Sequence, residues 1–175
     1  MGIKALYYKV LTSTEIAAGT MPVSGFSAVD VYQDTATFTE DDGSTTTHKS
    51  ETSGKKIVLK TKGDKHLAFS IMDPSKQERA DFEGGTYTPG QAATTGENPT
   101  PAVPATYVEP DGYQVIKMAF IVLPDEGDAL HIARANVVGK MNTTYSKQGI
   151  SLLEVTADPE TRVKYTEDQT IPGLA

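Results

Sequence analysis

The feature that most constrains the fold is an alternation of apolar and polar residues with a period of two, which recurs along most of the chain. Successive side chains of a β-strand point to opposite faces of a sheet, so this period is typical of half-buried strands. The alternation predicts strands at residues 4–10, 26–32, 35–39, 56–62, 66–72, 129–140 and 149–156. An apolar run at 113–123 predicts one more.

Local signals indicate how some of these strands connect. Gly63-Asp64 separates the strands at 56–62 and 66–72, and we expect a hairpin there. Asp73-Pro74 predicts the start of a short helix, because aspartate is a good N-cap and proline suits the first helical position. Ala80 and Phe82 are expected to face inward, and Gly84-Gly85 to end the helix. Residues 13–18 are compatible with a second short turn.

Three segments break the strand pattern. Residues 40–54 are polar throughout and are expected to form a long mobile loop or the tip of an extended hairpin. Residues 84–112 hold half of the ten prolines, and Pro99, Pro101 and Pro104 are expected to exclude regular structure. An insertion of this length is usually functional or disordered. The polar tail, residues 158–175, is expected to be loose.

These elements predict a mainly β protein. We expect residues 1–175 to form a single domain, an antiparallel β-sandwich or partly closed barrel, with one short α-helix, long loops and mostly meander order. A chain of 175 residues can bury a core without disulfides or metals. The run at 113–123 has only one charge, Lys117, and needs cover on both faces; in a small domain, another subunit is one candidate for one of these covers.

Composition excludes several classes of function. The absence of cysteine excludes disulfides, thiol catalysis and cysteine-ligated zinc. The net charge of −7 disfavours binding to nucleic acid or anionic membranes, so the lysines at 55, 56, 60, 62 and 65 are interpreted as an exposed strand face and turn. No segment is apolar enough to span a bilayer, and the N-terminus lacks the apolar region of a signal peptide. We therefore expect a protein made in, and kept or assembled in, a cytoplasm.

The stretch around Gly139-Lys140 resembles a nucleotide-binding or catalytic motif but satisfies neither. A P-loop needs glycine five residues before Gly-Lys and Ser or Thr after it, where this chain has Arg134 and Met141. Tyr145 and Lys147 have no Rossmann fingerprint upstream, so a packing role is expected for the tyrosine. The stretch is interpreted as a strand, a connection and a strand.

Other candidate sites fail on spacing. His48, His66 and His131 lack metal-ligand spacing. Two acidic runs, Asp125-Glu126 with Asp128 and Glu40-Asp41-Asp42, lack the pattern of an EF-hand and are interpreted as solvated turns. Asn142-Thr143-Thr144 matches a glycosylation acceptor, which we interpret as a chance match. We therefore predict a protein that is not an enzyme, with no catalytic, cofactor-binding or metal-ligating residues.

The C-terminal part of the chain resembles the phage major tail tube proteins. The segments YQVIKMAFIVLP and LHIARANVVGKMNTTYSKQGISLLEVTADP, between Tyr113 and Pro159, carry the resemblance. They combine a long apolar strand, an Ala/Arg/Val strand, a polar crossing with a glycine, and a closing strand. The helix after the 66–72 strand is in keeping with the family, whereas the insertion at 84–112 is not part of the pattern.

The resemblance implies a structural function in a virion tail, assembled in the cytoplasm of a bacterial host. Proteins of this family form hexameric rings that stack into a hollow tube, with other tail proteins as partners and no membrane. The inner sheets of neighbours join into a continuous barrel, and a long hairpin loop bridges to an adjacent subunit or ring. DNA passes through an acidic lumen without specific binding. The same fold serves contractile injection tubes, including type VI secretion, and that alternative stays open.

Two functions of other classes also stay open. One is a β-sandwich module that binds a small ligand or a glycan, with residues 84–112 as a lid. A deep, enclosed apolar pocket would favour it, while the absence of tryptophan argues against a glycan. The other is a hydrolase whose site is assembled from distant residues. A cluster of His66 or His131 with two carboxylates would favour that hypothesis.

Overall fold

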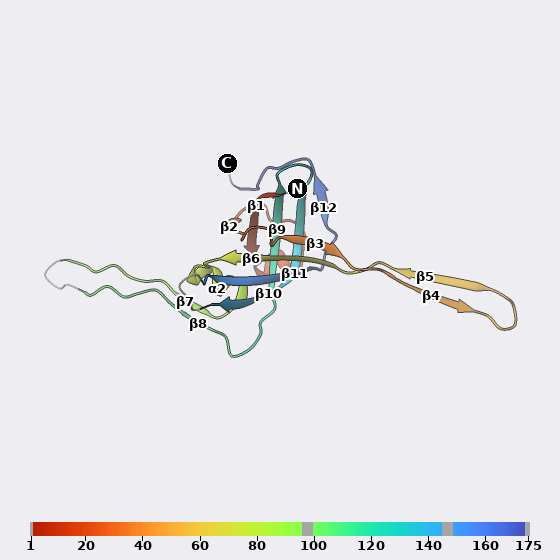
Figure 1. The fold of residues 1–175 in the computed structure, drawn as a ribbon, viewed down its shortest axis with the longest axis horizontal. Coiled ribbons are helices and arrows are strands. Elements are labelled where there is room, and N and C mark those ends of the chain that lie inside the picture. Colours follow the sequence, from red (N-terminus) through yellow and green to blue (C-terminus); the bar gives the residue numbers. More distant parts are fainter. Residues whose placement is uncertain (1, 96–99, 145–148, 174–175) are drawn as a thin grey trace.

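The computed structural model describes residues 2–95, 100–144 and 149–173, and antiparallel strands dominate it (Figure 1). The mainly β, antiparallel fold class is confirmed. The described ranges contain two helices, α1 (Ser13–Ala18), where a short turn was considered, and α2 (Lys76–Glu83), after the 66–72 strand. The strands are β1 (Ile3–Val10), β2 (Ser27–Val29), β3 (Thr37–Glu40), β4 (Ser44–Lys49), β5 (Lys56–Thr61), β6 (Lys65–Met72), β7 (Thr86–Thr88), β8 (Thr106–Val108), β9 (Ile116–Pro124), β10 (Ala129–Thr143), β11 (Ser151–Pro159) and β12 (Lys164–Thr166).

The main sheet has eight strands in the order β2-β1-β9-β10-β11-β6-β3, with β12 paired to β10. Within it, β9, β10 and β11 follow one another as a meander, but β1 and β6 pair with strands distant in sequence, so the predicted meander order is only partly right. A register shift between Ile132 and Ala135 interrupts the pairing of β10 with β9. Val31, just after β2, bridges to Ile71 of β6. The result is a sandwich-like arrangement rather than a closed barrel.

Strand β9 runs through the middle of the core and is buried on both faces. Met118, Phe120 and Val122 belong to the larger apolar cluster, which draws on β1, β6, β10, β11 and α2. The alternate residues Ala119, Ile121 and Leu123 belong to a second cluster, which is completed by Leu11, Phe26, Ala129 and partly buried side chains that include Ile16 and Ile171. Another subunit is therefore not needed to cover β9. Residues 11–26, which include α1, and the tail cover its second face, and the apolar run alone carries no information about which segments do so.

Helix α2 begins two residues later than predicted. Ser75 is the N-cap, because its Oγ accepts the Glu78 N–H at 3.2 Å while the Glu78 carboxylate accepts the Ser75 N–H at 2.7 Å. Asp73 has a φ of 49°, and its N–H donates to the Ser151 carbonyl at 2.9 Å, so it belongs to the end of the sheet. The helix ends before Gly84 as predicted, with Phe82 fully buried and Ala80 partly buried.

Two long two-stranded ribbons leave the sheet on opposite sides in Figure 1. In the first ribbon, residues 41–64, β4 pairs with β5, while β3 and β6 pair at its base. The predicted hairpin between residues 56–62 and residues 66–72 is therefore wrong. Residues 40–54 include β4 and the tip of an extended hairpin, which is one of the two structures expected for them. Gly63 does not reverse the chain. It allows the two legs of the ribbon to lie close together, because a Cβ there would lie 1.7 Å from the Asp41 carbonyl oxygen.

The second ribbon, described for residues 86–95 and 100–108, has regular pairing where the prolines were expected to exclude it. β7 pairs with β8, and Gln91 pairs with Val103 further out. Both the N–H and the C=O of Val103 bond to Gln91, at 2.9 and 2.8 Å. In such a pair the next residue, Pro104, directs its backbone nitrogen away from the partner strand. The N–H that proline lacks would therefore not have bonded to that strand.

The tail is more ordered than predicted. Asp158 and Pro159 end strand β11, β12 pairs with the first residues of β10, and Ile171 packs against the second apolar cluster. The predicted looseness of residues 158–175 is therefore wrong for the described part, residues 158–173, because a few apolar side chains are enough to anchor it to the core.

Candidate functional site

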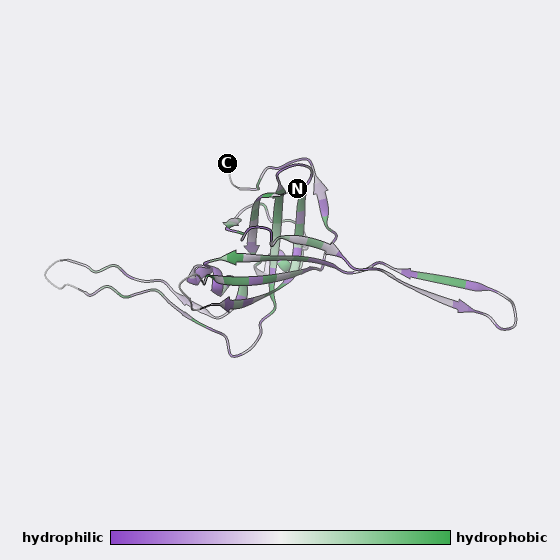
Figure 2. Cartoon of the chain, in the orientation of Figure 1, coloured by the Kyte–Doolittle hydropathy of each residue, from purple (hydrophilic) through white to green (hydrophobic). Residues whose placement is uncertain are grey.

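The first ribbon has the most distinctive surface of the described structure. All residues of β4 and β5 are exposed. Cross-strand partners share a face, so Ile57 and Leu59 lie together with His48 and Thr46. These two apolar side chains are 59% and 54% exposed, and Figure 2 shows the apolar stretch along β5. The alternation in β5 predicted a half-buried strand, but no described part of the chain buries its side chains.

The other face of the first ribbon is basic. It carries Val58 together with Lys49, Lys56 and Lys60, and Lys49 stands directly opposite Lys56. The outer part of the ribbon, residues 44–62, holds five lysines and one glutamate, a net charge of +4, whereas Asp41, Asp42 and Asp64 bring the whole ribbon, residues 41–64, to +1. On a chain whose net charge is −7, the part outside residues 44–62 therefore carries −11. A basic ribbon on an acidic body is attracted to the bodies of other copies and repelled by their ribbons.

The neck of this ribbon is held by ion pairs. Glu40 contacts Lys65 at 3.0 Å and Lys62 at 3.3 Å, and the hydrogen bond from Lys65 is the main cause that lowers the pKa of Glu40. The His66 ring lies between two carboxylates, with Nδ1 2.6 Å from Asp158 and Nε2 3.3 Å from Asp41. Hydrogen bonds to Asp158 first, and then to Asp41, raise the pKa of His66.

The cluster of His66 with two carboxylates is the arrangement that would favour the hydrolase hypothesis. A general base, however, needs a ring nitrogen with a free lone pair directed at a nucleophile. Here both ring nitrogens face carboxylate oxygens, so the arrangement fits an ion pair better than a base. Sequence spacing could not reveal it, because Asp41 and Asp158 lie 25 and 92 residues away from His66.

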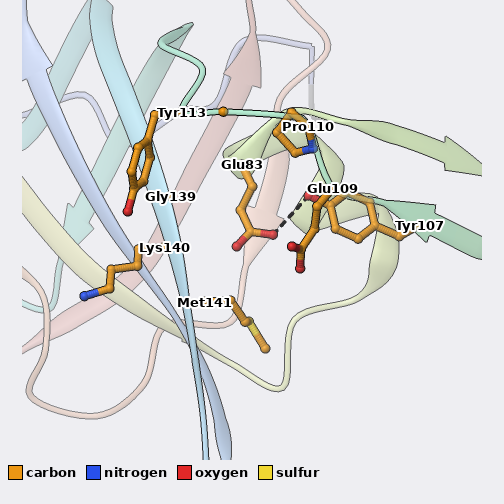
Figure 3. A pocket seen from close by; sticks show the side chains of 9 residues that line it. Glu83, Tyr107, Glu109, Pro110, Tyr113, Gly139, Lys140 and Met141 are labelled. Atoms are coloured by element: carbon orange, nitrogen blue, oxygen red, sulfur yellow. Dashed lines mark hydrogen bonds between the residues drawn. The ribbon is translucent and has the colours of Figure 1, made fainter.

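A groove of about 330 Å³ lies at the base of the second ribbon (Figure 3). Arg79 of α2 contacts Glu83 at 3.0 Å and Glu109 at 2.7 Å, and its guanidinium lies 4.6 Å from the centre of the Tyr107 ring. Burial, with a hydrogen bond to Glu83, raises the pKa of the Tyr107 hydroxyl to about 12. Charged and aromatic side chains fix the ribbon to α2 here, and the groove is not the enclosed apolar pocket that a ligand-binding module needs.

The Gly139-Lys140 stretch has a structural explanation. Gly139 lies within β10 where α2 packs, and a Cβ there would lie 2.8 Å from the Phe82 carbonyl oxygen. Lys140 is exposed beside the groove, paired in register with Glu154 of β11. Tyr145 and Lys147 lie outside the described residues. The glycine therefore serves helix packing, and no phosphate-binding turn is present at this position.

The remaining candidate residues are not brought together. His48 is exposed on the first ribbon, while His131 lies on β10, where burial lowers its pKa. The 125–128 turn is exposed, and Asn142 donates to Glu154 at 3.1 Å. Among residues 2–95, 100–144 and 149–173, no cluster of three His, Asp or Glu side chains is placed to hold a metal ion. The helices in these ranges are too short to traverse a membrane.

Comparisons with known proteins leave the family undecided. The sequence matches no protein-family model and no curated protein.

Proposed function

We propose that this chain is a structural subunit that self-assembles into rings stacked as the tail tube of a phage or prophage. The observation that carries the proposal is the first ribbon, with Ile57 and Leu59 exposed together on one face of two unsupported strands. A two-stranded ribbon alone is marginally stable in water, so a partner surface is needed to keep it in one conformation. In an assembly of identical subunits, each neighbouring copy provides such a surface for the ribbon.

The charge distribution supports a second copy of the chain as the partner. The +4 charge of the outer ribbon, residues 44–62, and the −11 charge of the rest of the chain favour contacts between the outer ribbon of one copy and the body of the next. A predominantly acidic body is also compatible with a lumen through which DNA slides without specific binding. The resemblance of Tyr113–Pro159 to tail tube proteins adds the hexameric ring, the other tail proteins and the location in a virion tail to the proposal.

Sedimentation velocity and electron microscopy of the purified protein at rising concentration test this proposal. Rings or tubes with a central hole are the expected result. A tube of a contractile injection or secretion system would also give rings. The genes next to the one that encodes this chain distinguish such a system from a phage tail. A monomer that never assembles, even with other tail components, contradicts the proposal and returns the ligand-binding module as the leading alternative.

A further inference from the structure

His66 lies where the first ribbon leaves the sheet and contacts both parts. Its Nδ1 is 2.6 Å from Oδ1 of Asp158, which lies near the end of β11. Its Nε2 is 3.3 Å from Oδ2 of Asp41, which lies in the neck of the ribbon, one residue after β3. The ring therefore links a carboxylate on the sheet to a carboxylate on the ribbon.

The protonation state of the ring decides whether both contacts hold. An ionised carboxylate only accepts hydrogen bonds, and a neutral imidazole has a single N–H to donate. In the neutral ring, one nitrogen would present its lone pair to a carboxylate, which is repulsive. The imidazolium donates from both nitrogens and completes both contacts. The raised pKa of His66, caused mainly by the hydrogen bond to Asp158, is consistent with this geometry.

Other charged groups near the ring include Asp64, which is exposed two residues before His66. Glu40 of β3 pairs with Lys62 and Lys65. Lys65 precedes His66 on β6 and so points to the opposite face, with its Nζ 5.8 Å from the Tyr165 ring of β12. On β11, Glu154 accepts a hydrogen bond from Asn142, which leaves Asp158 as the carboxylate of this strand beside the ring.

The neck is a break in the strand pairing between the sheet and the first ribbon. The ladders β3–β6 and β4–β5 are separated at residues 41–43 and 62–64, which contain Gly43 and Gly63. In this interval one backbone hydrogen bond, from the Asp41 N–H to the Asp64 carbonyl at 2.8 Å, joins the two legs. A break in two ladders with two glycines is a natural hinge, because only this hydrogen bond and the exposed ion pair of Glu40 with Lys62 join the two legs across the neck, apart from the contacts of His66.

We propose that His66 is a proton-controlled latch that sets the direction of the first ribbon relative to the sheet. With the ring protonated, Asp41 and Asp158 are tied together and the ribbon has one direction. With the ring neutral, the tie to Asp41 is released and the ribbon swings at its neck. The latch is complete below the ordinary pKa of histidine and is lost as the pH rises through the raised pKa of His66. It acts within one chain, so it holds for a monomer whether or not the protein assembles.

Spin-label distances measure this motion directly, because the chain has no native cysteine to interfere. Thr52→Cys at the tip of the ribbon and Ala17→Cys on α1 provide two exposed positions. Double electron–electron resonance on the dilute full chain at about pH 5.5 and about pH 9 brackets the histidine titration. We expect a narrow distance distribution at the lower pH, and a wider distribution with a shifted centre at the higher pH.

Variants assign the change to His66. In H66Q the distribution should be wide at both pH values, and D158N should weaken the pH response without removing the histidine. H48Q, on the exposed ribbon face, is the matched control and should respond as the wild type does. Circular dichroism checks that each variant is folded. A wild-type distribution that does not change with pH, or a pH response that persists in folded H66Q, would overturn the proposal.

Discussion

Gly139 of β10 lies directly against Phe82 of α2: a Cβ at Gly139 would stand 2.8 Å from the Phe82 carbonyl oxygen. Phe82 is the fully buried side chain that α2 contributes to the core, with its ring 4.6 Å from that of Tyr8 and 6.0 Å from that of Phe69. The missing side chain on the strand therefore lets the helix approach closely enough to bury its phenylalanine.

Replacing Gly139 with alanine should destabilise the fold. The added methyl group collides with backbone that has little room to shift, and overpacking of this kind typically costs about 1–3 kcal/mol. Urea unfolding measures the loss. Gly112→Ala is the matched control, because a Cβ there meets nothing within 4 Å, and it should leave the free energy of unfolding nearly unchanged. Equal effects of the two changes would contradict the packing role of Gly139.

Removing the Phe82 ring should be more costly still. Phe82→Ala loses a fully buried aromatic side chain and leaves a cavity between α2 and the sheet, so we expect a loss of about 3–5 kcal/mol. Val23→Ala, at a position that is 82% exposed, should change stability by less than about 0.5 kcal/mol. Thermal and urea unfolding of both variants provide the comparison.

The true N-cap of α2 can be tested by contrast with the predicted one. Ser75→Ala removes the side-chain acceptor of the Glu78 N–H and should cost about 1 kcal/mol. Asp73→Asn keeps a side chain that tolerates the positive φ of 49° and should cost much less. If Ser75→Ala leaves the free energy of urea unfolding unchanged, Ser75 is not the N-cap.

Alternation and capping chemistry predict elements well, because both depend on residues close in sequence. They predicted the antiparallel β class, the helix and its end at Gly84. They did not predict which strands pair with each other, because the alternation at 56–62 is the same whether this strand pairs with β6 or with β4. The Gly63-Asp64 dipeptide pointed to a turn, although Gly63 serves a close approach to Asp41.

The sequence also did not predict which segments bury the apolar strands. The reason is the same, because burial, like strand pairing, depends on residues that are distant in sequence. The apolar run at 113–123 requires cover, and on one face the cover comes from residues 11–26, which include α1, and from the tail, where apolar residues are few and scattered. Ile57 and Leu59 alternate as a half-buried strand does, yet no part of the described chain covers them. The contacts of His66 join three distant segments and leave no local signal. Long-range contacts of this kind depend on the whole fold.

Acid should destabilise the fold partly through Glu160. A hydrogen bond from Lys117 lowers the pKa of Glu160 below its ordinary value of 4.5. Because the folded-state pKa is the lower one, the stabilisation is present above the unfolded pKa and is lost as the pH falls through the folded pKa. Glu160→Gln should make the free energy of unfolding less dependent on pH in the acid range. Glu126→Gln, in the exposed β9–β10 turn, should retain the wild-type dependence in the same urea titrations.

The apolar face of the first ribbon should control assembly without controlling folding. Replacing Ile57 and Leu59 with serine removes two side chains, each worth about 1.5–3 kcal/mol when buried at an interface. The concentration at which rings form should therefore rise at least about tenfold. Thr47→Ser, on the opposite face of the same ribbon, is the control. If the double variant assembles as the wild type does, this face is not the contact surface.

Electron microscopy of the wild-type chain across a concentration series tests the central claim most directly. Self-assembly through the ribbons predicts rings with a central hole that stack into tubes as the concentration rises. A uniform monomer at every concentration, with or without other tail components, would contradict the proposed function.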